Sequence, residues 1–101
     1  MMPIKIRDQN EEVDKLVVDL ARTTDERNKL LRAKKYQRGQ KRRNIEEKIF
    51  QTHKRDTEIR KKLEAFGVRG LPNELIKRNA KELLQFDIFG KSTRKELEKL
   101  V

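Results

Sequence analysis

The spacing of apolar residues predicts helix over most of the chain. Between residues 13 and 31, and again between residues 45 and 66, positions suited to one helix face recur at alternating intervals of four and three. This is the heptad pattern of a coiled coil. We call these positions the seam, which consists of Val13, Val17, Leu20, Thr24, Arg27 and Leu31 in the first stretch and Ile45, Ile49, Thr52, Asp56, Ile59, Leu63 and Phe66 in the second. The pattern predicts an N-terminal arm over residues 1–8 and a charged coiled-coil region over residues 9–67.

The segment between the two stretches allows two arrangements. Residues 33–44 contain Gly39 and few apolar side chains. In the first arrangement residues 37–43 form a turn, and the two helices pack as an antiparallel hairpin. Aligning the apolar seam positions in this hairpin leaves one poor pair, because Leu20 then lies opposite Asp56.

In the second arrangement the chain stays helical from about Glu11 to Phe66 and dimerises, with a slip of the heptad phase across the middle. One Gly in a helix costs only about 1 kcal/mol, so Gly39 does not decide between them. The shortage of apolar residues around Gly39 favours the hairpin. In either case so few buried positions would make the isolated chain only marginally stable in water. We therefore expect a homodimer through the coiled-coil seam.

Capping patterns suggest where these helices begin. Asn10 precedes the first stretch. Asn44 with Glu47 three residues later forms a capping-box pattern, which predicts the start of the second helix. Thr23 with Glu26 forms another such pattern, at which the first helix could restart.

Residues 71–101 are predicted to form a C-terminal tail of two helices. Gly67 suits the end of the preceding helix, and Pro72 suits the first turn of a third helix. This third helix carries an amphipathic apolar stripe and is expected to end near Gln85.

The second half of the tail is predicted to be an apolar turn over residues 86–90 and a last helix capped by Thr93 with Glu96. The stretch from Phe89 to Leu100 resembles the second half of a SAP-type nucleic-acid-binding helix pair, in which a Gly and a small polar residue precede a charged, leucine-bearing helix. The first helix of such a pair is not clearly matched, so the resemblance assigns no family. The tail is expected to be a helix–turn–helix-like pair.

Composition narrows the fold class to all-α. Of the 101 residues, 44% are charged and 34% are apolar, whereas about a quarter charged and nearly half apolar is usual. Aromatic residues make up only 5%, which leaves too few strand-forming side chains for a β-sandwich or barrel. The absence of Cys excludes disulfide scaffolds and zinc ribbons. We expect one all-α domain that contains a coiled coil.

Signals for secretion or membrane insertion are missing from the sequence. The N-terminal residues MMPIKIR contain no apolar run of the length found in signal peptides, and no stretch approaches a membrane span. The acidic residues between Asp8 and Glu26 argue against a transit peptide. We expect an intracellular protein, cytoplasmic or nuclear, with no membrane partner.

Candidate catalytic chemistry is sparse. The chain has one His, His53, and one Ser, Ser92, so a catalytic triad would require both to meet from distant helices. Residues 90–93 read GKST, like the end of a phosphate-binding loop, but Gln85 stands where that motif requires Gly. No cluster of side chains has the spacing of metal ligands. We expect no enzymatic activity, no metal and no cofactor.

Positive charge is concentrated in one segment. The net charge is +10, from 27 Lys and Arg against 17 Asp and Glu. Residues 1–26 carry a net charge of −3, and residues 44–101 carry +4. Residues 27–43, which we call the basic segment, hold nine basic and no acidic side chains. Solvated helix faces normally mix the two signs, so this segment is expected to bind an anionic partner.

The predicted function is non-enzymatic binding of nucleic acid, DNA or RNA, through the phosphate backbone. Contact with five or six phosphates of duplex DNA would give a log–log salt slope of about −4.5 to −5. Tyr36 within the segment can stack on a base or sugar. The candidate nucleic-acid-binding residues are Arg32, Lys34, Lys35, Tyr36, Arg38, Lys41, Arg42, Arg43, Lys48 and Arg55. Neutralisation of these cations by the chain's own acids would contradict the prediction.

The alternative function is that of a small adaptor or inhibitor that binds an acidic protein or a ribonucleoprotein surface. For this function the partner-binding patch is expected in the apolar part of the tail, at Leu83, Phe86, Ile88 and Phe89. The competing interpretation of this patch is that it packs against the long helices or against a dimer mate.

Overall fold

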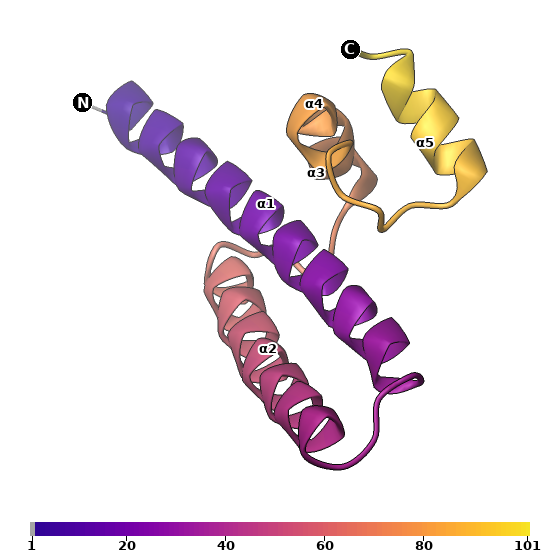
Figure 1. Ribbon diagram of the computed structural model, residues 1–101. Coiled ribbons are helices and arrows are strands. Elements are labelled where there is room, and N and C mark those ends of the chain that lie inside the picture. The colour runs from indigo at the N-terminus through magenta and orange to yellow at the C-terminus, as the bar shows by residue number, and fades with distance from the viewer. Residues whose placement is uncertain (1) are drawn as a thin grey trace.

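Two long helices form an antiparallel hairpin (Figure 1). The computed structural model describes residues 2–101, with side chains from residue 11 onwards. Helix α1 (Met2–Lys34) and helix α2 (Gln40–Ala65) are joined by a turn over residues 35–39. The hairpin prediction is confirmed, and a continuous helix through this region is wrong. The described residues contain helices and turns but no strand, which confirms the all-α fold class.

Helix α1 runs through residues 2–8, the segment predicted as an N-terminal arm, while residue 1 lies outside the described part of the chain. The helix also continues without a break past the capping pattern at Thr23. The Thr23 hydroxyl donates to the carbonyl oxygen of Asp19, at 2.8 Å, rather than capping a new helix. The molecule is elongated along the hairpin, with extents of 56 × 30 × 16 Å.

The hydrophobic core surrounds one half of α1. In Figure 1, α2 lies on one side of α1 and the C-terminal tail on the other. Leu20 of α1, Leu63 of α2 and Leu83 of the tail are all fully buried. The buried cluster consists of Val13, Leu16, Val17, Leu20, Ala21, Ile59, Leu63, Leu83 and Phe86. Seam residues and tail residues therefore bury one another within a single chain.

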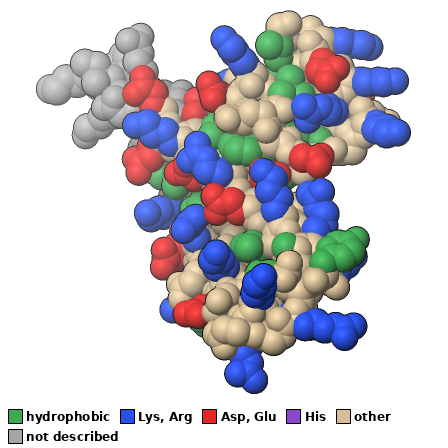
Figure 2. All heavy atoms as spheres, in the orientation of Figure 1, with side chains coloured by type: hydrophobic (Ala, Val, Ile, Leu, Met, Phe, Trp, Pro, Cys, Tyr) green, Lys and Arg blue, Asp and Glu red, His purple; other side chains and the backbone are tan. Residues whose placement is uncertain are grey.

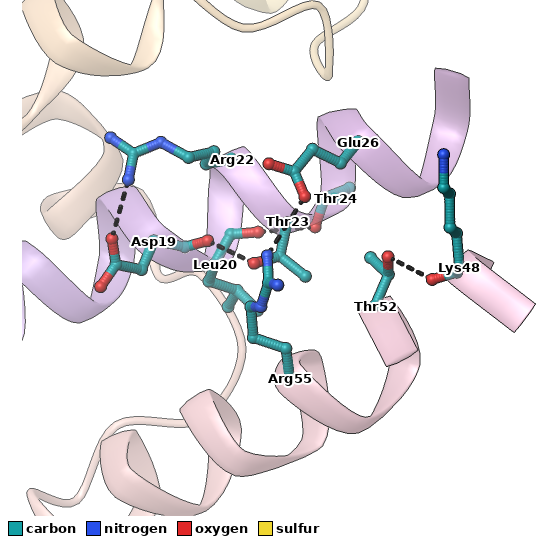
Figure 3. Close-up of polar contacts among 9 residues, drawn as sticks. All are labelled: Asp19, Leu20, Arg22, Thr23, Thr24, Glu26, Lys48, Thr52 and Arg55. Atoms are coloured by element: carbon teal, nitrogen blue, oxygen red, sulfur yellow. Dashed lines mark hydrogen bonds and ion pairs between the residues drawn. The ribbon is translucent and has the colours of Figure 1, made fainter. Parts of the chain in front are cut away.

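The seam is less buried toward the turn. Thr24 and Thr52 occupy seam positions, and each hydroxyl donates to a carbonyl oxygen four residues earlier on its own helix (Figure 3). Beyond them Leu31 is 44% exposed, and Ile45 is only half-buried. The half of the hairpin next to the turn is therefore held by little apolar contact.

Two ion pairs join the long helices near Asp56, the residue that the predicted register placed opposite Leu20. Arg55 of α2 pairs with Glu26 of α1, and Arg27 of α1 pairs with Asp56 of α2. Arg60, one turn further along α2, also pairs with Asp56. A buried carboxylate is costly beside an apolar side chain and less costly beside a cation, so these Arg side chains reduce the cost of burying Asp56.

Helix α2 begins four residues before the predicted start. Its first residue is Gln40, so Asn44 lies inside the helix and is not its N-cap. The Asn44 side-chain oxygen instead accepts a hydrogen bond from Gln40 Nε2, at 3.1 Å. The turn is consequently shorter than predicted and ends at Gly39.

The predicted end of α2 at Gly67 is confirmed. Gly67 has φ of +80°, and its backbone N–H donates to the Glu64 carbonyl oxygen at 2.9 Å. The N–H of Val68 donates to the Leu63 carbonyl oxygen at 2.9 Å. These two bonds form a Schellman motif, which satisfies carbonyl groups that the end of a helix leaves without a partner.

The tail contains three short helices where two were predicted: α3 (Asn73–Arg78), α4 (Ala80–Leu83) and α5 (Lys91–Glu98). The single third helix is interrupted at Asn79. There the Asn79 amide donates to Asp14 Oδ1 on α1 and to the Leu75 carbonyl oxygen, both at 2.9 Å. Helix α5 begins at Lys91, so Thr93 lies within its first turn instead of capping it.

Polar contacts attach the tail to α1. Arg78 donates to Asp14 Oδ1 from Nε and from Nη2, at 2.9 and 2.6 Å. Farther along α1, Asp25 Oδ1 accepts a hydrogen bond from the backbone N–H of Asp87 at 3.3 Å. Within the tail, the Arg94 guanidinium donates to two carbonyl oxygens of the preceding turn. These contacts attach the tail along α1 from Asp14 to Asp25, and the ion pair of Asp87 with Arg32 extends the attachment toward the turn.

Candidate functional site

The basic segment occupies one end of the molecule. It runs from the last turns of α1, through residues 35–39, into the first turn of α2. The hairpin therefore folds the segment back on itself, and Lys and Arg side chains project from this end in Figure 2. The acidic residues of α1 and the C-terminal tail lie toward the other end of the hairpin.

Five of the nine cations in the basic segment have an acidic partner within 4 Å. These ion pairs are Arg27–Asp56 (3.9 Å), Lys29–Asp25 (3.0 Å), Arg32–Asp87 (3.9 Å), Lys34–Glu46 (3.8 Å) and Arg42–Glu46 (3.2 Å). In the last two pairs, both cations approach the same carboxylate oxygen, Glu46 Oε1. Residues 1–26 supply only one of these partners, Asp25. Self-neutralisation of the segment is thus partial.

The other four cations of the segment have no acidic partner among the described residues. They are Lys35 and Arg38 in the turn and Lys41 and Arg43 in the first turn of α2, and we call them the turn cations. All four side chains are exposed. The positive charge without an acidic partner is therefore concentrated at the turn, whereas the sequence alone placed it over all seventeen residues of the basic segment.

The start of α2 adds to the positive potential at the turn. Its N-cap residue is Gly39, so no side chain caps the free backbone N–H groups, and its first turn contains no acidic residue. The N-terminal end of a helix carries a partial positive charge. The helix dipole and the turn cations therefore have the same sign at this end.

Three cations beside the turn are partly neutralised by acidic partners: Arg32, Lys34 and Arg42. Each is paired, but the Arg32 pair is long and both of its side chains are more than half exposed. Exposed pairs of this kind contribute little and exchange readily with other anions. These three residues border the turn and carry less free charge than the sequence prediction assigned to them.

Lys48 and Arg55 lie farther along α2, beside a groove of about 830 Å³ between the two helices. Arg55 reaches across to α1, where its Nη1 donates to Glu26 Oε2 at 3.2 Å (Figure 3). Lys48 is exposed and has no ion pair in the described structure. Lys29 also lines this groove and was absent from the predicted site. The sequence signal for Lys29 was its membership of the basic segment.

Tyr36 projects from the turn. Its side chain is 83% exposed, the highest exposure among the large apolar or aromatic residues of the described chain. Its backbone N–H donates to the Ala33 carbonyl oxygen at 3.1 Å, so its backbone extends the last turn of α1.

The apolar patch predicted for partner binding is used inside the chain. Leu83 and Phe86 belong to the buried cluster with α1, while Ile88 and Phe89 pack against it. The Arg22 guanidinium also lies 5.9 Å from the centre of the Phe86 ring. Leu83 and Phe86 are therefore covered within the chain, whereas Ile88 and Phe89 are half-buried and keep part of their apolar surface in solvent.

The residues of the other candidate chemistries lie on separate elements of the fold. His53 is exposed on α2, and Gly90 precedes α5 with no strand before it in the described chain. From residue 11 onwards, no three His, Cys, Asp or Glu side chains come together as a metal site would require. None of the described helices combines the length and apolar character needed to cross a membrane.

Comparison of the chain with protein-family models, with curated proteins and with solved structures finds no match.

Proposed function

We propose that the protein binds nucleic acid through the turn of the helical hairpin, by contact with the phosphate backbone. The observation that carries the proposal is the cluster of four exposed turn cations without acidic partners. Clustered Lys and Arg bind nucleic acid by releasing the cations condensed around its phosphates, and this requires no base-specific contact.

The structure supports a smaller contact than the sequence predicted. If each turn cation contacts one phosphate, the log–log salt slope on duplex DNA is about −3.6, compared with about −4.5 to −5 for five or six contacts. Arg32, Lys34 and Arg42 add to the slope only to the extent that phosphate replaces their own carboxylate partners.

The experiment compares two variants of equal net charge. In the turn variant, the four turn cations are changed to Gln. In the control variant, four exposed cations elsewhere are changed to Gln: Lys61, Lys62, Lys77 and Lys99. Binding to labelled nucleic acid is measured by fluorescence anisotropy over a range of salt concentrations, with circular dichroism to check the helix content.

We expect the turn variant to lose more than about tenfold in affinity and most of its salt dependence, because each lost phosphate contact lowers the slope by about one. The control variant should keep most of both. Equal losses in the two variants would reduce the effect to net charge alone. Failure of the folded wild-type protein to bind at low salt would exclude the proposal.

The alternative, an acidic protein or ribonucleoprotein partner, uses the same cations. A pull-down with the turn variant tests it, since loss of one protein band without change in nucleic-acid binding would favour that alternative. A homodimer through the seam would have to use its half next to the turn, because Val17, Leu20 and Leu63 are already buried within one chain while Leu31 is 44% exposed.

A further inference from the structure

Tyr36 has an unusual environment for an aromatic side chain. Its ring is 83% exposed, and Tyr36 lies outside the buried cluster and the residues packed against it. Exposing an aromatic ring in water is unfavourable, and an aromatic ring usually gains stability by contact with apolar or π surfaces. Nothing in the described chain covers this ring.

The position of Tyr36 is well defined even though its ring is exposed. Backbone hydrogen bonds join Lys35 to Arg32, Tyr36 to Ala33 and Gln37 to Lys34, so three successive N–H groups continue the end of α1. A side chain on a fixed backbone loses less entropy when it binds than one on a loose loop. Tyr36 is therefore an exposed aromatic platform carried on a hydrogen-bonded backbone.

Cations without acidic partners lie immediately beside this platform in the sequence. Lys35 precedes Tyr36 and Arg38 follows two residues later, both exposed. Sites for single-stranded nucleic acid combine these two features, since the cations follow the backbone and the aromatic ring stacks on a base. A duplex site needs only the cations, because duplex bases are already stacked on one another.

We infer that the turn binds single-stranded or unpaired nucleic acid in preference to duplex, with one exposed base stacked on the ring of Tyr36. This inference rests on the proposed function and names the class of its ligand. The shared ligand chemistry is an unpaired base flanked by backbone phosphates, which single-stranded DNA, single-stranded RNA and RNA loops all supply.

The chain carries its own reporter for this contact. Tyr36 is the only Tyr, and there is no Trp, so the tyrosine fluorescence of the protein comes from this one side chain. We expect oligo(dU) and oligo(U) to quench this fluorescence as they bind, and duplex DNA at equal occupancy to leave it nearly unchanged. These two oligonucleotides differ only in the sugar, so quenching by one and not the other would identify the preferred sugar. Full occupancy by both single strands without quenching would overturn the inference.

Two substitutions of Tyr36 test whether binding depends on its aromatic face or on its hydroxyl. Tyr36→Leu keeps an apolar side chain but removes the aromatic face, whereas Tyr36→Phe keeps the face and removes only the hydroxyl. We expect Tyr36→Leu to lower single-strand affinity about fivefold to tenfold, which is the low end of the range for one base–aromatic stack. Tyr36→Phe should bind as the wild type does, and neither substitution should change duplex affinity by more than about twofold.

The outcomes distinguish the two proposals. If the turn variant loses binding but Tyr36→Leu binds single strands as well as the wild type, the phosphate contact stands and the stacking inference fails. If the folded wild-type protein binds neither single strands nor duplex at low salt, the proposed function fails. Tighter wild-type binding to duplex than to single strands of equal phosphate number would also overturn the inference.

Discussion

The same substitution at two positions of α1 tests the hairpin directly. Leu20 and Leu31 both occupy seam positions, and a continuous coiled coil would bury them alike. In the structure, Leu20 is fully buried, while Leu31 is 44% exposed. Leu20→Ala and Leu31→Ala therefore make a matched pair with the same chemistry on the same helix.

The expected magnitudes follow from burial. Leu20 lies in the cluster formed by α1, α2 and the tail, so its truncation loses transfer free energy and leaves a cavity, at a cost of about 3–4 kcal/mol. Leu31 is already partly in water and can leave no enclosed cavity, so its truncation should cost about 1 kcal/mol or less.

The assay is urea denaturation followed by circular dichroism. With an m-value of about 1.5 kcal/mol/M, the midpoint should fall by about 2–2.7 M for Leu20→Ala and by about 0.7 M or less for Leu31→Ala. If Leu20→Ala does not fold, Leu20→Val and Leu31→Val keep the comparison at a smaller cost. Equal losses at the two positions would show that the whole seam is buried, and this would refute the hairpin packing described above.

Three further substitutions test contacts of the hairpin and the tail. Asp14→Ala should cost about 1–3 kcal/mol and speed hydrogen exchange in α3 and α4, because Arg78 and Asn79 lose their acceptor. Asp19→Ala breaks only an exposed ion pair, so it should change the free energy of unfolding by no more than about 0.5 kcal/mol. Equal losses of stability for Asp14→Ala and Asp19→Ala would contradict this account. Gly67 has a positive φ, so Gly67→Ala should cost about 1–2 kcal/mol of stability and lower the thermal midpoint. Gly90 has φ of −69°, so Gly90→Ala should be nearly neutral. Asp56→Leu should leave stability unchanged or raise it by up to about 2 kcal/mol, because Asp56 Oδ1 is buried without a hydrogen-bond partner among the described residues. A clear loss of stability would show that the ion pairs of Asp56 stabilise the fold.

Local pattern was enough to predict the helices and the main break between them. Alternating intervals of three and four predicted two long helices, and a Gly just after the second predicted its end at Gly67, where the structure has a Schellman motif. Local pattern misplaced the helix starts, however. Asn44 and Thr93 have the side chains of N-caps, but both lie inside helices that begin earlier. A capping residue stabilises a helix start only modestly, so neighbouring residues with helical preference can extend the helix past it.

The sequence predicted the basic segment and ten candidate residues of the site, but not which of its cations lack an acidic partner among the described residues. Nine cations without an acid in residues 27–43 are visible in the sequence, and so is Tyr36 among them. Which cations are neutralised depends on acids elsewhere in the chain. Glu46 lies beside Lys34 because the hairpin closes, and Asp87 lies beside Arg32 because the tail docks on α1.

By itself, then, the sequence determined the helical class, the two long helices and the concentration of positive charge, because helix periodicity and charge are local properties of the chain. Only the tertiary structure decided that Leu83 and Phe86 are buried against α1, and which cations of the basic segment have no acidic partner among the described residues. These depend on contacts between residues far apart in the chain, such as Asp14 with Arg78, and on the burial that selects one register over its neighbours. The same packing leaves Tyr36 and the turn cations uncovered at the end of the hairpin, where the apolar seam runs out.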